Sequence, residues 1–346
     1  MQEVPPEAQM AGYIAGPLLA ACIHLAAQRD FADLIEAADN HQASIEYISQ
    51  AANIHPIWTR AVLLALTKAN IFVETEEHLF KNTPLSDCLR RDHPQTLKWQ
   101  ASVLISPRLF VLLSQLDSNV NQVDISFHRK LWGQELYELF AKQEKDQPTR
   151  LSPERILIEL ESREEFDLML ESINVTANPA IAEAYPFKGS VCDIGGGRGR
   201  LLTAIVSRYP DVKGTLFESQ FALDNLQSQQ AEYPFSLAAG DFFQQVPRAD
   251  IYILQQIFHN WPDKLCSAIL QRCAEANPDA KVLVIERVLG DPNSQAEIAN
   301  LYMMIDQNGQ ERSIEEYRAI GASAGFNQLQ VYQTQSVYTI VELARV

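Results

Sequence analysis

The first half of the chain carries hydrophobic residues at spacings of three and four, a pattern that predicts helices. The pattern runs from Gln9 to about Ile181 with almost no glycine, so we expect a mainly α-helical region. Ser44 can cap a short helix over residues 45–52, and a second helix follows the turn at residues 53–56. Two short β-like runs come next, on either side of residues 74–77. This order of elements is typical of a winged helix.

From Ser190 onward the pattern changes to short apolar strands that alternate with helices. Strands are predicted at residues 191–194, 214–217, 249–254 and 281–285, each followed by helical sequence. Alternation of this kind indicates βαβ units and a parallel sheet. Residues 327–333 and 337–344 read as two strands with a short polar connection, which predicts a closing antiparallel hairpin.

These two patterns predict two domains, residues 1–180 and residues 181–346. Within the first domain, residues 141–165 are polar and rich in charge and contain Pro148 and Pro153, so we expect an insertion or linker at the surface. Two interpretations fit this stretch: a solvated helix-loop-helix without a function of its own, or a flap over an active site.

Composition and charge narrow the choice of partners. Hydrophobic residues make up 47% of the chain and charged residues 21%, as in ordinary globular proteins. The formal net charge of −16 would repel phosphate backbones and anionic lipid headgroups, so neither nucleic acid nor a membrane is expected as a partner. The winged-helix region, residues 41–100, balances six basic side chains with six acidic ones. A dimerisation or substrate-capping module is therefore favoured over a DNA reader.

Further features predict a cytoplasmic protein. The most apolar stretch, residues 11–27, is too short to span a bilayer comfortably. A secretory leader begins with positive charge, whereas no Lys or Arg precedes Arg29 here. The five cysteines are widely spaced and form no CxxC pair, which predicts reduced structural thiols. No metal is expected, because the histidines are scattered and no carboxylate pair has a compelling ligand spacing.

A glycine-rich turn, residues 193–199, follows the first strand of the second domain and opens a helix. Its sequence, Asp-Ile-Gly-Gly-Gly-Arg-Gly, lets backbone N–H groups approach a nucleotide-like ligand without interference from Cβ atoms. A dinucleotide site would need glycine at the sixth position counted from Gly195, where this chain has Arg200. Asp193 suits a cofactor with a positively charged amino acid portion better than a pyrophosphate. A tight structural turn is the alternative.

Six blocks in order make this chain resemble the class I S-adenosylmethionine-dependent O-methyltransferases of small molecules, the branch with plant caffeate-type and bacterial antibiotic and phenazine-type enzymes. They are VCDIGGGRGRLLTAIVSRYP, GTLFES, AAGDFF, ILQQIFHNWPDKLC, VLVIERV and GQERSIEEYRAIGASAGF. The match covers residues 191–346 closely, and the helical first half is similar to the family's dimerisation domain more loosely. The resemblance implies an α/β fold with a Rossmann-like, seven-stranded, mostly parallel sheet, S-adenosylmethionine as cofactor, and a homodimer.

The resemblance also implies residues that bind the cofactor. Gly195 and Gly197, with Asp193, would line its methionine end, and Glu218 would bind both ribose hydroxyls with its two carboxylate oxygens. Without the glycine turn, Glu218 would be interpreted as an ordinary surface carboxylate. The remaining cofactor-binding candidates are Asp241 and Phe242 at the adenine, and Gln255, which stands where the family frequently has lysine.

A histidine at the position of His259 is the general base in this family. Imidazole titrates near pH 6.5 and can take the proton of a phenol, whose own pKa lies near 10. Glu286 and Glu311 match the two acids that flank the base, and a carboxylate bonded to His259 would fix its tautomer. The alternatives are a structural histidine, and a Glu311 that caps the helix beginning at Ser313.

The expected acceptor is a phenolic or enolic hydroxyl of a small secondary metabolite, aromatic or polyketide-like. Residues expected to line its pocket are Phe258, Asn260, Trp261, Met303, Met304 and Asp306. Methionine and aromatic residues are more often plain core, and Asn260 replaces an acid common in plant members. The fold would equally allow N-methylation, or an S-adenosylmethionine-assisted rearrangement or cyclisation without methyl transfer. A non-enzymatic, DNA-binding metabolite sensor is a third hypothesis.

Overall fold

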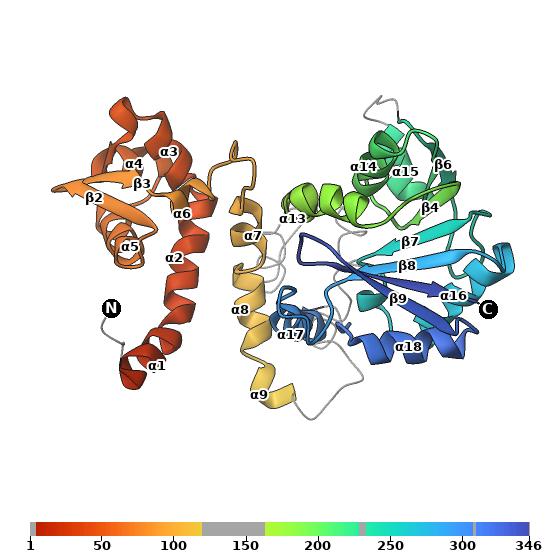
Figure 1. Ribbon diagram of the computed structural model, residues 1–346. Coiled ribbons are helices and arrows are strands. Elements are labelled where there is room, and N and C mark those ends of the chain that lie inside the picture. The colour runs from red at the N-terminus through yellow and green to blue at the C-terminus, as the bar shows by residue number, and fades with distance from the viewer. Residues whose placement is uncertain (1–4, 120–162, 228–232, 307–308, 346) are drawn as a thin grey trace, which may run out of the picture. The chain divides into compact units, whose positions relative to one another are not determined.

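The computed structural model describes residues 5–119, 163–227, 233–306 and 309–345 (Figure 1). The chain divides into two compact units, one of residues 1–114 with 145–174 and the other of residues 115–144 with 175–346. The expected insertion at residues 141–165 lies outside the described residues except at its last three positions. Helix α9 (Leu116–Asn119) belongs to the second unit, and the long helix α13 (Arg163–Ala184) crosses the division.

The first unit is helical and contains a small antiparallel sheet with the strand order β1-β3-β2. Its elements are α1 (Pro6–Ile14), α2 (Gly16–Gln28), α3 (Phe31–Ala37), η1 (Asp39–His41), β1 (Ala43–Ser44), α4 (Ile45–Ala52), α5 (Pro56–Lys68), β2 (Phe72–Glu76), β3 (Leu79–Asn82), α6 (Pro84–Asp87), α7 (Lys98–Val103) and α8 (Pro107–Leu113). The Ser44 hydroxyl accepts a hydrogen bond from the Tyr47 amide at 3.1 Å and so caps α4 as predicted. The predicted order of two helices followed by two strands is present.

The second unit holds a seven-stranded sheet in the order β6-β5-β4-β7-β8-β10-β9, which confirms the predicted fold. The strands are parallel except β10, which pairs antiparallel with β8 and β9. The elements are β4 (Ser190–Ile194), α14 (Arg200–Arg208), β5 (Lys213–Glu218), α15 (Gln220–Gln227), β6 (Ser236–Ala239), β7 (Ile251–Gln255), η2 (Phe258–Asn260), α16 (Asp263–Ala276), β8 (Lys281–Glu286), α17 (Ala296–Asp306), α18 (Ile314–Ser323), β9 (Gln328–Gln333) and β10 (Thr339–Ala344).

Strand β6 is the one strand of this seven-stranded sheet that the sequence pattern did not single out. It has four residues, lies at the edge of the sheet and pairs only with β5. None of its side chains is fully buried, so it lacks the apolar run that identifies the central strands.

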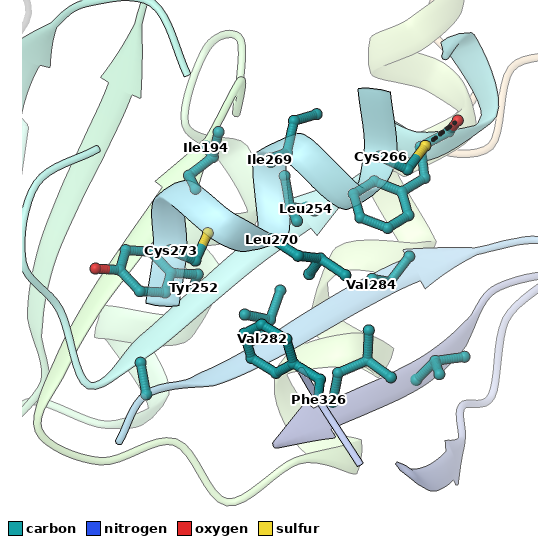
Figure 2. Close-up of a cluster of buried hydrophobic side chains, with 14 of the residues drawn as sticks. Ile194, Tyr252, Leu254, Cys266, Ile269, Leu270, Cys273, Val282, Val284 and Phe326 are labelled. Atoms are coloured by element: carbon teal, nitrogen blue, oxygen red, sulfur yellow. Dashed lines mark hydrogen bonds between the residues drawn. The ribbon is translucent and has the colours of Figure 1, made fainter. Parts of the chain in front are cut away.

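Apolar packing between α16 and the centre of the sheet fixes the edge at which the candidate residues lie. Figure 2 shows Ile269 and Leu270 of α16 against Leu254 of β7 and Val284 of β8, all four fully buried. Burial of one such side chain contributes about 1.5 to 3 kcal/mol. Strands β7 and β8 are therefore held in register, and the turn after β7 and the last residue of β8 are held with them.

All five cysteines are free thiols, and Cys192, Cys266 and Cys273 are buried, as expected for structural thiols. No single helix in the described ranges is long and apolar enough to cross a membrane. Helices α1 and α2 pass that length and composition test only together, as a pair bent by 48°.

Candidate functional site

Four candidate residues of the second unit lie where parallel strands end: Asp193 on β4, Glu218 on β5, Gln255 on β7 and Glu286 on β8. Strand β4 pairs with β5 on one side and with β7 on the other, so the chain reverses its direction across the sheet at β4. Ligands of open α/β sheets bind at the carboxyl ends of the strands at such a reversal. The glycine turn follows β4, and His259 follows β7.

The glycine turn has the open backbone that the sequence predicts. Gly195, Gly197 and Gly199 have φ angles of +67°, +57° and +68°, which side-chain-bearing residues rarely adopt. A Cβ atom on Gly197 would meet nothing within 4 Å, so the space beside the turn is open. The Gly197 amide donates to Glu218 Oε1 at 3.2 Å, which brings the end of β5 to the turn.

Asp193 is a buried carboxylate below this turn. It is 1% exposed, and neither carboxylate oxygen has a hydrogen-bond partner among the described residues. Burial, and secondly the charge of Glu218, raise the pKa of Asp193 to about 7. A buried acid without donors is costly unless a positive group approaches it. The turn and this acid therefore fit the methionine end of S-adenosylmethionine, which carries a cationic amine and a sulfonium.

The other cofactor candidates lie around the turn. Phe242 approaches Gly195, because a Cβ atom there would lie 4.0 Å from Phe242 Cε1. Asp241 accepts from the Phe243 amide at 2.9 Å and from Gln244, so both of its carboxylate oxygens bond within their own loop. Gln255 ends β7 and donates to Asn178 Oδ1 of α13 at 3.1 Å, a partner that sequence spacing did not indicate.

His259, Glu286 and Glu311 meet in three dimensions. His259 Nδ1 lies 3.1 Å from Glu311 Oε1 and 3.5 Å from Glu286 Oε2, and the His259 amide donates to Glu286 Oε1 at 3.3 Å. The imidazole is 13% exposed and both acids are buried. With Nδ1 donating to Glu311 Oε1, the ring lone pair belongs to Nε2.

The capping alternative for Glu311 does not match the structure. The Ser313 hydroxyl caps α18 by accepting from the Glu316 amide at 3.4 Å, and the Glu316 carboxylate accepts from the Ser313 amide at 2.8 Å. Instead, the Glu311 carboxylate contacts His259 Nδ1, and the Glu311 amide donates a hydrogen bond to Asn300 Oδ1 at 2.9 Å.

Burial and mutual charge shift the pKa values of this cluster. Burial alone would lower the pKa of His259, but Glu286 and then Glu311 outweigh it, so that pKa is raised above its usual value. Burial raises the pKa of Glu286 to about 7, helped by the neighbouring Glu311 and opposed by His259. Glu286 therefore changes its charge near neutral pH beside His259, a property common at sites of acid–base chemistry.

The same three side chains could also hold a cation. One ligand atom from each lies within 4.8 Å of the others, a grouping that the spacing of these residues along the chain did not predict. The absence of a catalytic metal stays a prediction.

The acceptor candidates lie in different environments. Phe258 requires a correction: its side chain is fully buried in the core cluster beneath the turn, so it packs there and offers no surface to an acceptor. Trp261 packs edge-on against Phe243 at 4.9 Å and Phe242 at 6.3 Å, beside the adenine candidate. Asn260 Nδ2 donates to the Gln256 carbonyl at 3.0 Å.

The candidates on α17 differ in exposure. Met303 is buried, and Asp306 is buried with its Oδ2 accepting from the Tyr302 hydroxyl at 2.9 Å. Met304 is 48% exposed. Arg312 was missed by sequence reasoning, although it directly follows Glu311 and is fully buried. The signal in the sequence that could have identified Arg312 was its position directly after a candidate acid.

Comparison with known proteins gives a consistent result. Residues 158–327 match the O-methyltransferase domain family. The chain is 28% identical over 350 residues to the phenazine O-methyltransferase PhzM of Lysobacter antibioticus, covering 98% of this chain and 96% of that one.

Solved structures extend the likeness to the whole fold. The crystal structure of LaPhzM superposes with a TM-score of 0.85 at 27% identity, over 99% of this chain and 100% of that one. The O-methyltransferase NcsB1 from neocarzinostatin biosynthesis, solved with S-adenosylmethionine and 2-hydroxy-5-methyl naphthoic acid, superposes with a TM-score of 0.75 at 25% identity, over 94% and 96% of the two chains.

Proposed function

We propose that this chain, which belongs to the S-adenosylmethionine-dependent O-methyltransferases of secondary-metabolite type, methylates a phenolic or enolic hydroxyl of a small aromatic or polyketide-like acceptor. His259 acts as the general base. The observation that carries the proposal is the contact of His259 Nδ1 with Glu311 Oε1 at 3.1 Å, at the sheet edge where the glycine turn also lies. NcsB1 was solved with a hydroxylated naphthoic acid, an acceptor of this class.

In this proposal the cofactor binds to the residues around the glycine turn. Asp193 faces the cationic methionine end with Gly195 and Gly197, Glu218 binds the ribose hydroxyls, and the Phe242 ring lies on the adenine, with Asp241 and Gln255 nearby. When bound, S-adenosylmethionine supplies an electrophilic methyl group. The residues of the chain hold the acceptor oxygen in line with that methyl group and exclude water from the site.

His259 takes the acceptor's proton on Nε2. Because Nδ1 donates to Glu311 Oε1, the neutral ring presents a lone pair at Nε2 and becomes an imidazolium after the transfer. The two acids stabilise that imidazolium, since one accepts its Nδ1 proton and both carry negative charge when ionised. A positioned base of this kind is typically worth about 10² to 10⁴ in rate.

The acceptor would contact the residues next to the base. Asn260 and Trp261 follow His259 directly, and Met303, Met304 and Asp306 lie on α17, which precedes the Glu311 segment. Their differing exposure supports different roles, with the half-exposed Met304 the most accessible of the three on α17. Full burial removes both Phe258 and Asp306 from direct contact with the acceptor, so Asp306 would support α17 through Tyr302.

The first domain, residues 1–180 in our proposal, forms the homodimer and caps the acceptor site. Helices α1 and α2 support this role, because they expose Met10, Tyr13, Ile14 and Leu18, each more than half exposed. An apolar face of this kind is typical of an interface, and a second copy of the chain would bury it.

The experiment that tests the proposal is product analysis with a panel of hydroxylated aromatic acceptors. S-adenosylhomocysteine and an O-methylated product are expected together. His259→Ala should lower the rate by about 10² to 10⁴, whereas His41→Ala, at an exposed histidine of the first unit, should not change it. An N-methylated product would favour the alternative acceptor, and product without S-adenosylhomocysteine would favour non-methylating chemistry. An unchanged rate in His259→Ala would remove the general base.

A further inference from the structure

Arg312 is a buried charged side chain that the proposed reaction does not use. It lies in the segment Gly309–Arg312, between α17 and α18, and is fully buried. Its guanidinium donates to the Phe258 carbonyl at 2.8 Å and to the Trp261 carbonyl at 2.6 Å. Phe258 is the first residue of the η2 turn and Trp261 caps its end. The guanidinium therefore holds the turn that carries His259 at both ends.

The other residues of this segment hold His259 itself. The Gln310 amide donates to the His259 carbonyl at 2.9 Å, and Glu311 accepts from the imidazole. Gly309 approaches the same carbonyl so closely that a Cβ atom would overlap it. One short segment thus fixes both the backbone and the ring of the proposed base.

The segment is in turn anchored to the rest of the unit. The Leu289 amide donates to the Arg312 carbonyl at 3.0 Å, and Val288 forms a β-bridge with Arg312. Val288 follows β8, the strand that ends at Glu286. Both carboxylates near His259 are therefore tied to the same backbone frame as Arg312.

Arg312 also brings positive charge to His259 and to the buried acid Glu286. Its ion-pair partner, Asp263, lies 2.8 Å away but is 58% exposed, so water screens that carboxylate more than it screens the buried groups. The charge of Arg312 opposes the rise in the pKa of His259 and of Glu286. Two other titratable groups of this cluster, Tyr317 of α18 and Cys266 of α16, have pKa values raised by burial far above neutral and stay protonated.

We propose that Arg312 is a positioning residue for the transfer reaction. It holds the η2 turn by two backbone carbonyls, so that His259 keeps Nδ1 on Glu311 and Nε2 free for the acceptor's proton. The bidentate contact requires the planar, five-donor guanidinium, which lysine does not reproduce. The inference rests on the proposed role of His259 as general base.

The test follows the His259 ring directly by NMR of the full-length protein labelled with ¹⁵N-histidine, and needs no acceptor. His259→Asn assigns the signal. In the unaltered protein we expect an Nδ1–H signal protected by Glu311. Arg312→Lys keeps the charge but loses the two-carbonyl contact, so the Nδ1–H signal should be lost. The titration midpoint should fall with it, because the hydrogen bond to Glu311 raises the pKa of His259. Arg312→Met should also lose the signal, but its midpoint should lie above that of Arg312→Lys, because it removes a positive charge that lowers this pKa.

Two controls make the outcome decisive. Arg248→Lys changes an exposed arginine that donates to the Ala276 carbonyl outside the turn, and should leave both observables unchanged. Thermal unfolding and S-adenosylhomocysteine binding check that each variant is folded, and if Arg312→Met fails to fold, Arg312→Lys decides alone. An intact Nδ1–H signal in folded Arg312→Lys would overturn the inference.

Methyl transfer then separates this inference from the proposed function. Arg312→Lys should lower kcat by about 10- to 100-fold, with the KM for S-adenosylmethionine changed far less. If the NMR changes appear but His259→Ala leaves the rate unchanged, the base assignment fails and the positioning of the ring stands. If His259→Ala is inactive and the folded Arg312 variants retain both rate and signal, the positioning fails and the base stands.

Discussion

Replacement of Asp193 by asparagine should stabilise the ligand-free protein at alkaline pH and weaken its cofactor binding. The carboxylate is buried without a partner, and its pKa is raised from 3.8 to about 7. The difference of 7 minus 3.8 is about 3 units, and each unit corresponds to about 1.4 kcal/mol. The ionised acid therefore costs the native state up to about 4 kcal/mol, a cost that an uncharged asparagine avoids.

The raised pKa of Asp193 sets the direction in which the stability of the protein changes with pH. A carboxyl group with a pKa higher in the folded state than in the unfolded state binds more protons when folded. Its stabilising contribution is complete below pH 3.8 and is lost as the pH rises to about 7. Between pH 8 and pH 6 the unaltered protein should gain about 1.4 kcal/mol from this group, one pKa unit's worth, and Asp193→Asn should lack that gain.

Urea unfolding at pH 6 and pH 8 measures both quantities, and the raised pKa of Glu286 cancels because it is common to the two proteins. Calorimetric titration with S-adenosylmethionine should show affinity weakened about tenfold or more, since hydrogen bonds to charged groups contribute about 1.5 to 3 kcal/mol. A variant that is less stable at pH 8, with unchanged cofactor affinity, would refute the reasoning and make Asp193 a structural residue of the turn.

Three further predictions concern the base, the metal and the interface. Glu311→Gln removes a charge that raises the pKa of His259, so the acidic limb of kcat/KM against pH should move to lower pH while kcat falls; a limb that stays in place contradicts the assignment. Dialysis against EDTA should leave methyl transfer unchanged, because in the proposed reaction His259 accepts the proton without a metal; loss of activity restored by a divalent cation would point to the three-residue grouping as a metal site. Leu18→Asp, on the exposed face of α2, should raise the dimer dissociation constant measured by sedimentation by at least tenfold, with Lys68→Asp on α5 as the charge control.

The sequence predicted the fold well because its signals are local. The alternation of apolar strands with helices, the cap at Ser44 and the hairpin at the end of the chain all depend on neighbouring residues, and the structure has each of them. Edge strand β6 escaped prediction because an exposed strand of four residues lacks an apolar run. Family resemblance supplied the candidates Glu286 and Glu311, which no spacing rule could have selected.

The sequence by itself determined which residue types stand at the strand ends and where glycines leave the backbone without side chains. Only the tertiary structure decided which of these side chains come into contact. Glu286 and Glu311 lie 27 and 52 positions beyond His259, and they converge because β7 and β8 are parallel neighbours and the Val288 bridge brings the Glu311 segment to the same edge. Burial also depends on what packs around a side chain in space, so the sequence alone did not determine it. Phe258 is buried away from the proposed acceptor pocket, and burial raises the pKa of Asp193. The buried Arg312 donates to the Phe258 carbonyl of the turn.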